Sequence, residues 1–248
     1  MKINRTVTIR FYEELNDFIK TEMQKKDIAF QLSGSPTVKD VIESYGVPHT
    51  EVDLILVDGE SVDFNYHLKP GNHISVFPKF ESLDIQTVSQ IRAEPLREVK
   101  FILDVHLGKL AKFLRLSGFD TTYKTQQDDK KIIQLAKQEK RIILTRDIGI
   151  LKHSEVTHGY FVRADNPKKQ LPEIIQRFDL KDMIKPFTRC LECNGLLKQA
   201  DKNEIREQLE PSTEKYYTKF YVCKSCKKIY WKGSHYKDMI EFINKTLK

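Results

Sequence analysis

Two CxxC pairs near the end of the chain constrain its fold more than any other feature of the sequence. The pairs are Cys190–Cys193 and Cys223–Cys226, with 29 residues between them. Two such turns can bring four thiolates to one ion, and so predict a four-cysteine zinc site that is structural because no position is left for water. We expect a hairpin in the spacer and a tight turn at Gly195. The alternative, a redox motif, lacks a thioredoxin-like context around either pair.

The composition is that of a folded protein, with 31% charged and 40% hydrophobic residues, which excludes disordered and collagen-like chains. No apolar run approaches the roughly 18 residues that a membrane-spanning helix needs. The first residues alternate polar and apolar side chains and lack the apolar core of a signal peptide. We therefore expect a cytoplasmic protein without membrane contact, in which a metal site is favoured over disulfides.

The net charge of +7 is unevenly distributed along the chain. Residues 1–84 carry nine basic and fourteen acidic side chains, whereas residues 85–248 carry 33 basic and 21 acidic ones. A basic surface favours a polyanionic partner, with nucleic acid the first candidate. The alternative is a solvated basic face that has no partner.

Residues 1–84 have the pattern of a β-grasp, ubiquitin-like domain. Alternating polar and apolar residues predict strands on both sides of a single helix at 38–46. The strands are expected at residues 2–11, 28–32, 52–57, 60–62 and 73–78. Thr37 is expected to cap the helix and Gly46 to end it. The domain has no Gly-Gly tail and runs on into the next one, so we interpret it as an interaction or substrate-positioning module.

After a linker at 85–98, residues 99–185 alternate strands and helices. This order predicts an α/β domain with a parallel sheet and right-handed crossovers. Strands are expected near 99–104, 119–125, 141–145 and 159–163, and helices near 107–118, 130–140, 148–153 and 169–178. Pro172 is expected in the first turn of the last helix. Residues 186–248 hold the zinc ribbon and a tail rich in basic and aromatic residues.

Acidic side chains follow the strands of this expected sheet. Asp104 ends the first strand, Asp147 follows the third, and Asp129 opens a helix that leads back into the sheet. Ligands bind beyond the carboxyl ends of parallel strands, so we expect these carboxylates to converge. Together they would need cations, and hard oxygen ligands suit Mg²⁺ or Mn²⁺. Taken singly, each of the three is an ordinary cap or turn residue, and Asp128 and Asp165 are weaker additional candidates.

A site of this kind suits hydrolysis of a phosphodiester by a metal-activated water. Four basic residues nearby are expected to hold phosphates: Lys109, Lys112, Arg115 and Arg146. In the tail, aromatic rings can stack on unpaired bases while lysines meet phosphates. The candidates there are Lys228, Tyr230, Trp231, Lys232 and Tyr236. The alternative is that Tyr230 and Trp231 pack the ribbon against the preceding domain.

The stretches FILDVHLGKLAKFLRLSGFDT, DDKKIIQLAKQEKRIILTRD, RCLECNG and CKSCKKIYWKGSHY together resemble the Mut-seven C-terminal ribonuclease family over residues 99–240. Residues 1–84 resemble the ubiquitin-like domain often fused to it. The resemblance implies a PIN-like nuclease fold with a C-terminal zinc ribbon. It also matches Asp104, Asp129 and Asp147 to the acidic metal-binding positions of PIN nucleases. PIN nucleases usually have a further acidic residue after the first strand, whereas the helix expected over 107–117 has none.

The leading functional hypothesis is a metal-dependent ribonuclease that acts endonucleolytically, with structured RNA such as tRNA as one candidate substrate. The missing helix carboxylate favours a second hypothesis, a non-catalytic RNA-binding adaptor. A third is a protein-interaction scaffold in which the β-grasp domain binds the partner.

Overall fold

The computed structural model describes residues 5–78, 89–91 and 98–246 of the chain. The chain divides into two compact units. The first comprises Met1–Arg97 with Thr145–Phe161, and the second comprises Glu98–Leu144 with Val162–Lys248. Most of the expected linker lies outside the described residues, which include only 89–91 and 98 of it. Within the described part of the chain, no helix combines the length and the apolar character needed to cross a membrane.

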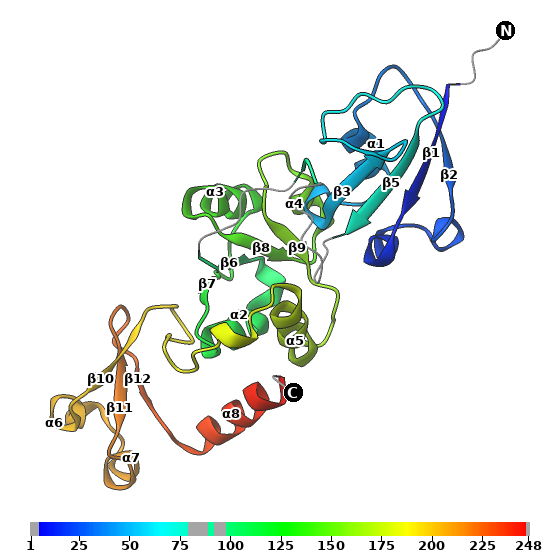
Figure 1. The fold of residues 1–248 in the computed structure, drawn as a ribbon. Helices are drawn as coiled ribbons and strands as arrows, with labels where there is room; N and C mark the ends of the chain where they lie inside the picture. Colours follow the sequence, from blue (N-terminus) through cyan, green and yellow to red (C-terminus); the bar gives the residue numbers. More distant parts are fainter. Residues whose placement is uncertain (1–4, 79–88, 92–97, 247–248) are drawn as a thin grey trace. The chain divides into compact units, whose positions relative to one another are not determined.

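A five-stranded mixed sheet forms most of the first unit, with the strand order β2-β1-β5-β3-β4 (Figure 1). Strands β1 and β5 run parallel, and the other neighbouring strands are antiparallel. The elements are β1 (Thr6–Phe11), β2 (Ile28–Gln31), α1 (Val38–Ser44), β3 (Val52–Val57), β4 (Glu60–Ser61) and β5 (His73–Pro78). This arrangement confirms the ubiquitin-like β-grasp expected from the sequence.

Local signals set the boundaries of this sheet and its helix. The Thr37 side chain accepts from the Asp40 amide, and the Asp40 carboxylate accepts from the Thr37 amide, which is a complete capping box. Gly46 follows the helix with φ 98°, a conformation that disfavours other residues. Asp58 and Gly59 both have positive φ between β3 and β4, as a tight hairpin turn requires. Thr37 and Gly46 thus take the places expected of them, and the turn joins the two strands expected at 52–57 and 60–62.

The remaining elements of the first unit are short. Three are 3₁₀-helices: η1 (Glu13–Phe18), η2 (Thr21–Met23) and η3 (His49–Glu51). The segment Thr145–Phe161 adds α4 (Ile148–Lys152) and β9 (Gly159–Phe161). The sequence predicted α4 and β9 but none of the 3₁₀-helices as such.

The second unit contains a parallel sheet in which β6 lies between β7 and β8. Phe101 of β6 pairs with Thr121 on one side and Ile142 on the other. The elements are β6 (Lys100–Leu103), η4 (Val105–Leu107), α2 (Gly108–Leu116), β7 (Asp120–Thr122), α3 (Asp129–Glu139) and β8 (Ile142–Thr145). β6 and β8 are apolar and buried almost throughout, as strands covered on both faces must be. The mixed α/β fold with a parallel sheet is thereby confirmed.

The helix after β9 starts earlier than the sequence indicated. α5 spans Pro167–Arg177, the Asn166 side chain accepts from the Lys168 amide, and Pro167 takes the first helical position. Asn166 and Pro167 are therefore a helix start. Pro172 lies inside the helix, so its expected place in the first turn was wrong. The 3₁₀-helix η5 (Lys181–Met183) follows α5.

A three-stranded antiparallel sheet, β10-β11-β12, follows η5. The strands are β10 (Leu197–Ala200), β11 (Phe220–Cys223) and β12 (Ile229–Trp231). The hairpin expected in the spacer is present as β10 paired with β11. Its connection is helical and comprises α6 (Lys202–Ile205), η6 (Arg206–Gln208) and α7 (Pro211–Tyr216).

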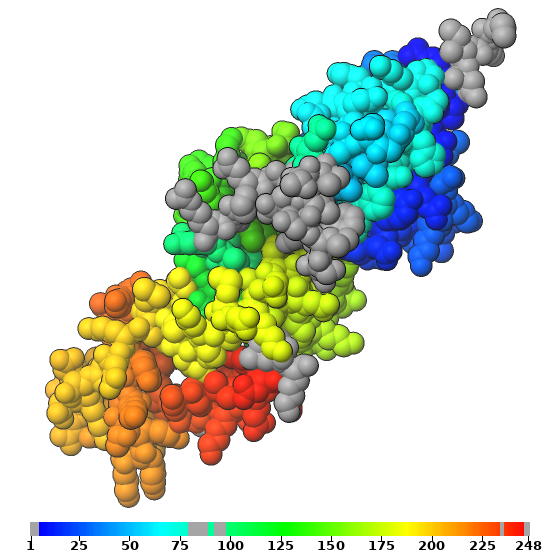
Figure 2. Space-filling view, in the orientation of Figure 1, coloured from blue at the N-terminus to red at the C-terminus, as the bar shows by residue number. Residues whose placement is uncertain are grey.

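The described residues end in a helix, α8 (Ser234–Thr246), where the sequence indicates only a basic and aromatic tail. Its Phe242 ring lies 4.6 Å from the Phe113 ring of α2, and Ile243 is buried. In Figure 2, α8 (red) lies against the yellow segment that precedes the small sheet, in agreement with the 4.3 Å separation of the Phe187 and Tyr236 rings. This helix therefore packs against its own unit.

Candidate functional site

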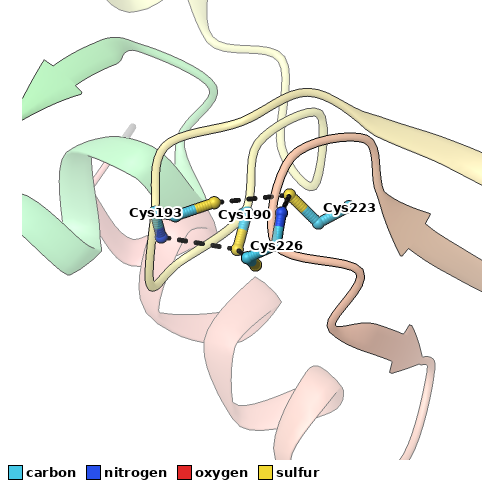
Figure 3. Close-up of side chains that lie close together, drawn as sticks. All are labelled: Cys190, Cys193, Cys223 and Cys226. Carbon is cyan, nitrogen blue, oxygen red and sulfur yellow. Dashed lines mark hydrogen bonds between the residues drawn. The ribbon is translucent and has the colours of Figure 1, made fainter.

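Four cysteine side chains meet at one point of the second unit (Figure 3). Their sulfur atoms all lie within 4.8 Å of one another. The Cys190 and Cys226 sulfurs are 3.6 Å apart, and the Cys193 and Cys223 sulfurs 3.4 Å apart. A tetrahedral ion with bonds of about 2.3 Å separates its sulfur ligands by about 3.8 Å, whereas a disulfide would need about 2.0 Å. The geometry fits zinc.

Each CxxC pair folds as a turn that points both sulfurs the same way. The Cys193 amide lies 3.5 Å from the Cys190 sulfur, and the Cys226 amide lies 3.5 Å from the Cys223 sulfur. A left-handed residue follows each pair, Asn194 with φ 68° and Lys227 with φ 64°. The two turns have the same local design, as a shared ion requires.

Gly195 is required because the second CxxC turn packs directly against its Cα atom. A Cβ atom there would lie 2.6 Å from the Ser225 hydroxyl and 2.9 Å from the Cys223 sulfur. The left-handed conformation of the turn falls on Asn194. Glycine thus lets the first CxxC turn pack directly on the second.

The thiols do not ionise alike. Burial raises the pKa of Cys190, but hydrogen bonds from the Tyr230 hydroxyl and from the Cys193 and Glu192 amides lower it to about 6. The Lys228 amide lowers the pKa of Cys226, but burial and the neighbouring sulfurs raise it to about 12. Four thiolates this close repel one another, so full deprotonation needs a bound cation. Zn²⁺ would supply that charge.

Zinc content is directly measurable. We expect one zinc per chain in the purified protein, because four thiolates complete one tetrahedral site. Cys223→Ser should lose most of this metal, whereas Ser225→Ala, within the same turn, should keep it. Metal analysis by mass spectrometry, together with thiol titration before and after chelation, checks both. A metal-free protein with four freely reactive thiols would contradict the assignment.

Arg115 holds the first CxxC turn against the parallel sheet. It is 3% exposed, and burial lowers the pKa of its guanidinium. Its Nε donates to the Thr121 carbonyl at 2.9 Å, and its Nη1 donates to the carbonyls of Leu191 and Glu192 at 3.0 and 2.8 Å. These are backbone groups of β7 and of the turn. In this arrangement the guanidinium does not face solvent, where RNA would meet it.

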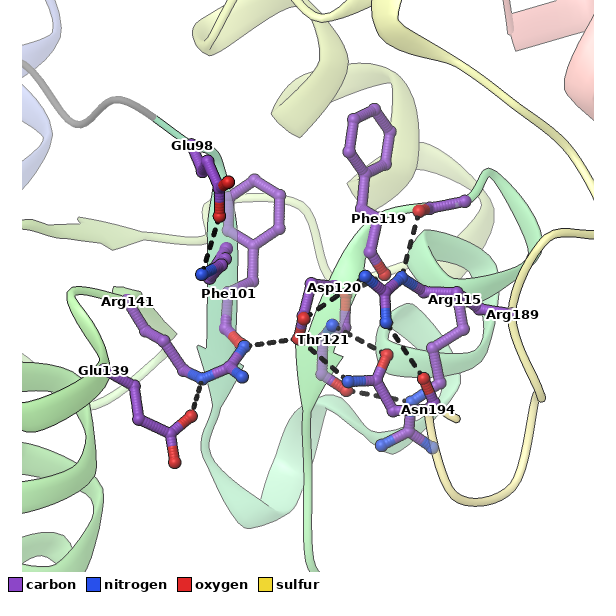
Figure 4. Close-up of polar contacts among 12 residues, drawn as sticks. Glu98, Phe101, Arg115, Phe119, Asp120, Thr121, Glu139, Arg141, Arg189 and Asn194 are labelled. Atoms are coloured by element: carbon purple, nitrogen blue, oxygen red, sulfur yellow. Dashed lines mark hydrogen bonds and ion pairs between the residues drawn. The ribbon is translucent and has the colours of Figure 1, made fainter. Parts of the chain in front are cut away.

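Asp120 of β7 is the centre of a second set of contacts, which also joins the sheet to the first CxxC turn (Figure 4). Its carboxylate lies 2.6 Å from Arg141, 3.2 Å from Arg189 and 2.8 Å from the Asn194 amide nitrogen. Asn194 also accepts from the Thr121 amide at 2.9 Å. Burial raises the pKa of Asp120, but Arg141 and Asn194 outweigh it and leave the pKa below its usual value. Asn194 belongs to the first CxxC turn, so this network joins the cysteine site to the sheet.

The three predicted acidic residues all lie where a strand ends or a helix begins. Asp104 is 3% exposed and follows β6, and its carboxylate accepts from the His106 amide at 2.8 Å. Asp147 is exposed and caps α4, accepting from the Gly149 amide at 2.6 Å. Asp129 is the first residue of α3, and Asp128 caps that helix by accepting from the Lys131 amide. Asp104 and Asp147 are therefore caps, as expected of each taken singly, whereas Asp128 rather than Asp129 caps α3.

The four cysteines form the one group of three or more potential ligands able to hold a metal ion within the described residues. Asp104 and Asp129 belong to the second unit, and Asp147 belongs to the first. Asp165 is exposed just before the Asn166 cap. The acidic metal site thus stays a prediction.

Several side chains predicted to contact RNA have partners inside the protein. The Tyr230 hydroxyl lies 3.0 Å from the Cys190 sulfur and accepts from the Leu191 amide. Lys112 and Lys228 lie 3.7 and 3.3 Å from the same carboxylate oxygen of Glu192. Tyr230 therefore supports the first CxxC turn, and Glu192 offsets part of the basic charge.

Other predicted contact residues face solvent. Lys109 is exposed on α2, and Arg146 is half-buried in the first unit. Trp231 is 39% exposed. Lys232 is exposed, with its ammonium 5.0 Å from the centre of the half-buried Tyr236 ring. Trp231 and Lys232 thus remain accessible on the small sheet and the loop after it.

The sequence argument missed Tyr216, the most exposed of the large hydrophobic side chains within the described residues, at 72%. It ends α7, and the Lys215 ammonium lies 5.6 Å from the centre of its ring. The run Lys215-Tyr216-Tyr217 combines a lysine with aromatic rings, much as the tail does. That composition was the available signal.

These features define a class of protein: an α/β chain with a parallel sheet, an N-terminal ubiquitin-like region and a C-terminal cysteine cluster of the zinc-ribbon kind. Residues 99–243 match the family model described as the Mut7-C RNAse domain, and residues 4–84 match the one described as Mut7-C ubiquitin. The chain belongs to the Mut7-C RNAse family, which confirms the resemblance found in the sequence. Neither a curated protein nor a solved structure matches the chain.

Proposed function

We propose that the chain is a PIN-like, metal-dependent endoribonuclease. The pairing of β6 with β8 carries the proposal, because Leu103 pairs with Leu144 in parallel. Asp104 comes directly after β6, and Asp147 comes two residues after β8. Ligands of parallel sheets bind beyond this edge. The family model for a ribonuclease domain supports the same reaction class.

The acidic residues have the chemistry that a hard cation requires. Asp104, Asp129 and Asp147 offer carboxylate oxygens, the ligands that Mg²⁺ and Mn²⁺ prefer. A bound ion would supply an activated water and offset the charge on the leaving oxygen of the phosphodiester. Asp104 and Asp147 each accept a hydrogen bond from a backbone amide through one carboxylate oxygen, and this bond fixes the orientation of the carboxylate. Structured RNA such as tRNA is the proposed substrate, and an open sheet edge favours internal cleavage.

The parts of the chain take separate roles in this proposal. Residues 1–84 are the ubiquitin-like domain, 85–98 the linker, 99–185 the nuclease domain and 186–248 the zinc ribbon with its basic, aromatic end. Zinc stabilises the ribbon, and the ribbon helps to hold RNA. Lys109 on α2 and Lys232 after β12 are exposed and suited to phosphate. Arg115 and Tyr230 are left out of this surface because both hold the first CxxC turn.

The test is cleavage of labelled total RNA by the purified chain with Mn²⁺ or Mg²⁺. We expect discrete internal products that disappear when EDTA removes the ion. Sequencing the product ends then identifies the substrate and separates internal cleavage from trimming. Absence of cleavage in every metal, with RNA bound, would contradict the enzyme and favour the second candidate.

That second candidate is a non-catalytic RNA-binding adaptor. One observation favours it: α2 contains no acidic residue, and Lys109 and Lys112 lie exposed along it. Fewer carboxylates hold a metal less tightly. The basic surface would then bind RNA without cutting it.

RNA binding by the ribbon predicts a specific loss. Trp231→Ala and Tyr216→Ala should each weaken binding of a single-stranded oligonucleotide by about 1–3 kcal/mol, the range for one stacked base. Met183→Ala is the matched control, because Met183 is also an exposed apolar side chain but has no ring. Fluorescence anisotropy at two salt concentrations measures the affinity. Unchanged affinity in both aromatic variants would exclude stacking by the ribbon.

A further inference from the structure

We propose that the ubiquitin-like domain positions the segment that carries Asp147, through the 3₁₀-helix η3. The catalytic consequence rests on the proposed function, because it takes Asp147 as a metal ligand. The positioning itself rests on contacts within the first unit, which contains both the ubiquitin-like sheet and Thr145–Phe161. In this proposal the domain supports another segment of its own chain, in addition to any binding of a separate partner.

Two buried polar side chains of η3 bond to the backbone of this segment. His49 is 9% exposed, with its Nε2 2.8 Å from the Val156 carbonyl and its Nδ1 2.7 Å from the Glu43 carboxylate. Glu51 is 1% exposed, and its carboxylate accepts from the Phe161 amide at 2.7 Å. A buried charge is costly unless it is hydrogen-bonded. Glu51 has such a partner on the segment.

Contacts at the end of α4 and on β9 complete the attachment. The Lys152 ammonium donates to the Glu43 carbonyl at 2.7 Å. The Phe18 and Phe161 rings pack edge to face with centres 5.4 Å apart. Ile150, Leu151 and Val156 are buried, so the segment also has an apolar face that is covered. The attachment therefore combines charge-assisted hydrogen bonds with apolar packing.

α4 depends on such support because it has only five residues. Helices this short are not stable by themselves and need tertiary contacts. Asp147 begins α4 as its cap, and Lys152 ends it against the Glu43 carbonyl. Loss of the contacts from η3 would therefore loosen the backbone that orients Asp147. His49 and Glu51 are thus positioning residues, since both are at least nine-tenths buried and hydrogen-bond to the backbone of the segment.

The test uses the full chain with Glu51→Ala, its conservative counterpart Glu51→Gln, and Glu60→Ala as control. Glu60 lies exposed on β4, and its replacement removes the same charge elsewhere in the domain. By hydrogen–deuterium exchange, peptides from 145–161 should exchange at least tenfold faster in Glu51→Ala. Peptides from 100–116 should not change. Glu51→Gln, which keeps an oxygen acceptor, should restore most of the protection, and Glu60→Ala should match the wild type.

Cleavage kinetics provide the second readout. Glu51→Ala should lower kcat with little change in KM, and Glu51→Gln should recover it. If the chain proves not to cleave RNA, the exchange result still decides the positioning. Unchanged exchange over 145–161 in Glu51→Ala would overturn it, whatever the activity. Should Glu51→Ala fail to fold, Lys152→Met, made in α4 itself, must give the same local increase in exchange or the proposal fails.

Discussion

Asp104→Asn and Asp147→Asn should each reduce RNA cleavage by roughly a thousandfold. Bound cations typically contribute several kcal/mol of transition-state stabilisation, and each 1.4 kcal/mol is a factor of ten in rate. Asparagine keeps the side-chain oxygen that accepts from the His106 or Gly149 amide. The substitution removes the negative charge of the aspartate. It therefore weakens metal binding while the local turn is retained. Single-turnover cleavage at one fixed Mn²⁺ concentration, just sufficient to saturate the wild type, measures the effect, and thermal unfolding checks the fold.

Asp201→Asn is the matched control for both variants. Asp201 caps α6 by accepting from the Asn203 amide at 2.8 Å, the same i to i+2 contact that Asp104 and Asp147 make. It lies in the helical connection between β10 and β11, which is no part of the parallel sheet. We expect this variant to cleave at the wild-type rate. If all three variants cleave alike, the acidic residues are ordinary caps and the proposed site is wrong.

The fold was predictable where short-range signals agree with the core. Three examples are the capping box at Thr37, the Asp58-Gly59 turn and the apolar strand at 142–145. In each, the residues that determine the local structure lie within a few positions of one another. The early start of α5 was missed because Pro172 stood out more than the Asn166-Pro167 start. α8 was missed because its lysines and aromatics were interpreted as a binding surface.

In the candidate site, too, the features set by neighbouring residues were predictable, and those set by distant residues were not. The cysteine cluster follows from two local spacings and a single ion. The position of Arg115 does not, because its partners Leu191 and Glu192 lie 76 and 77 residues further along the chain. Tyr230 likewise reaches Cys190 across 40 residues. Burial of a cation or a phenol by distant backbone is a tertiary property, which residue type alone leaves undetermined.

The second large effect concerns stability. Asp120→Ala should lower the free energy of unfolding by about 3 kcal/mol, because it removes the carboxylate that the buried Arg141 shares with Arg189 and Asn194. Arg141 then keeps its 2.6 Å contact with the more exposed Glu139. Arg141 is 9% exposed and also contacts the Phe101 carbonyl, so its charge has little access to water. A loss of this size corresponds to a fall of roughly 6–12 °C in the midpoint of thermal unfolding. Differential scanning calorimetry of the full chain measures it.

Acid should reveal the same network in the wild-type protein. The pKa of Asp120 is lowered in the folded state, so its carboxylate stabilises the fold above the unfolded pKa. That contribution is lost as the pH falls below the ordinary value of 3.8 and through the lowered one. The difference between wild type and Asp120→Ala should therefore be full at neutral pH and shrink at acidic pH. A difference that stayed constant down to the acid transition would exclude an ionic origin.

Glu98→Ala separates this buried network from an ordinary surface pair. Glu98 lies 2.7 Å from Lys100 at the start of β6, but its side chain is 72% exposed. Exposed pairs contribute about 0–1 kcal/mol, so this variant should melt close to the wild type. Asp120 differs by its burial and by its bond to Asn194 of the first CxxC turn. We therefore expect Asp120→Ala, and not Glu98→Ala, to release zinc faster to a chelator, because only the former loosens the attachment of that turn to the sheet.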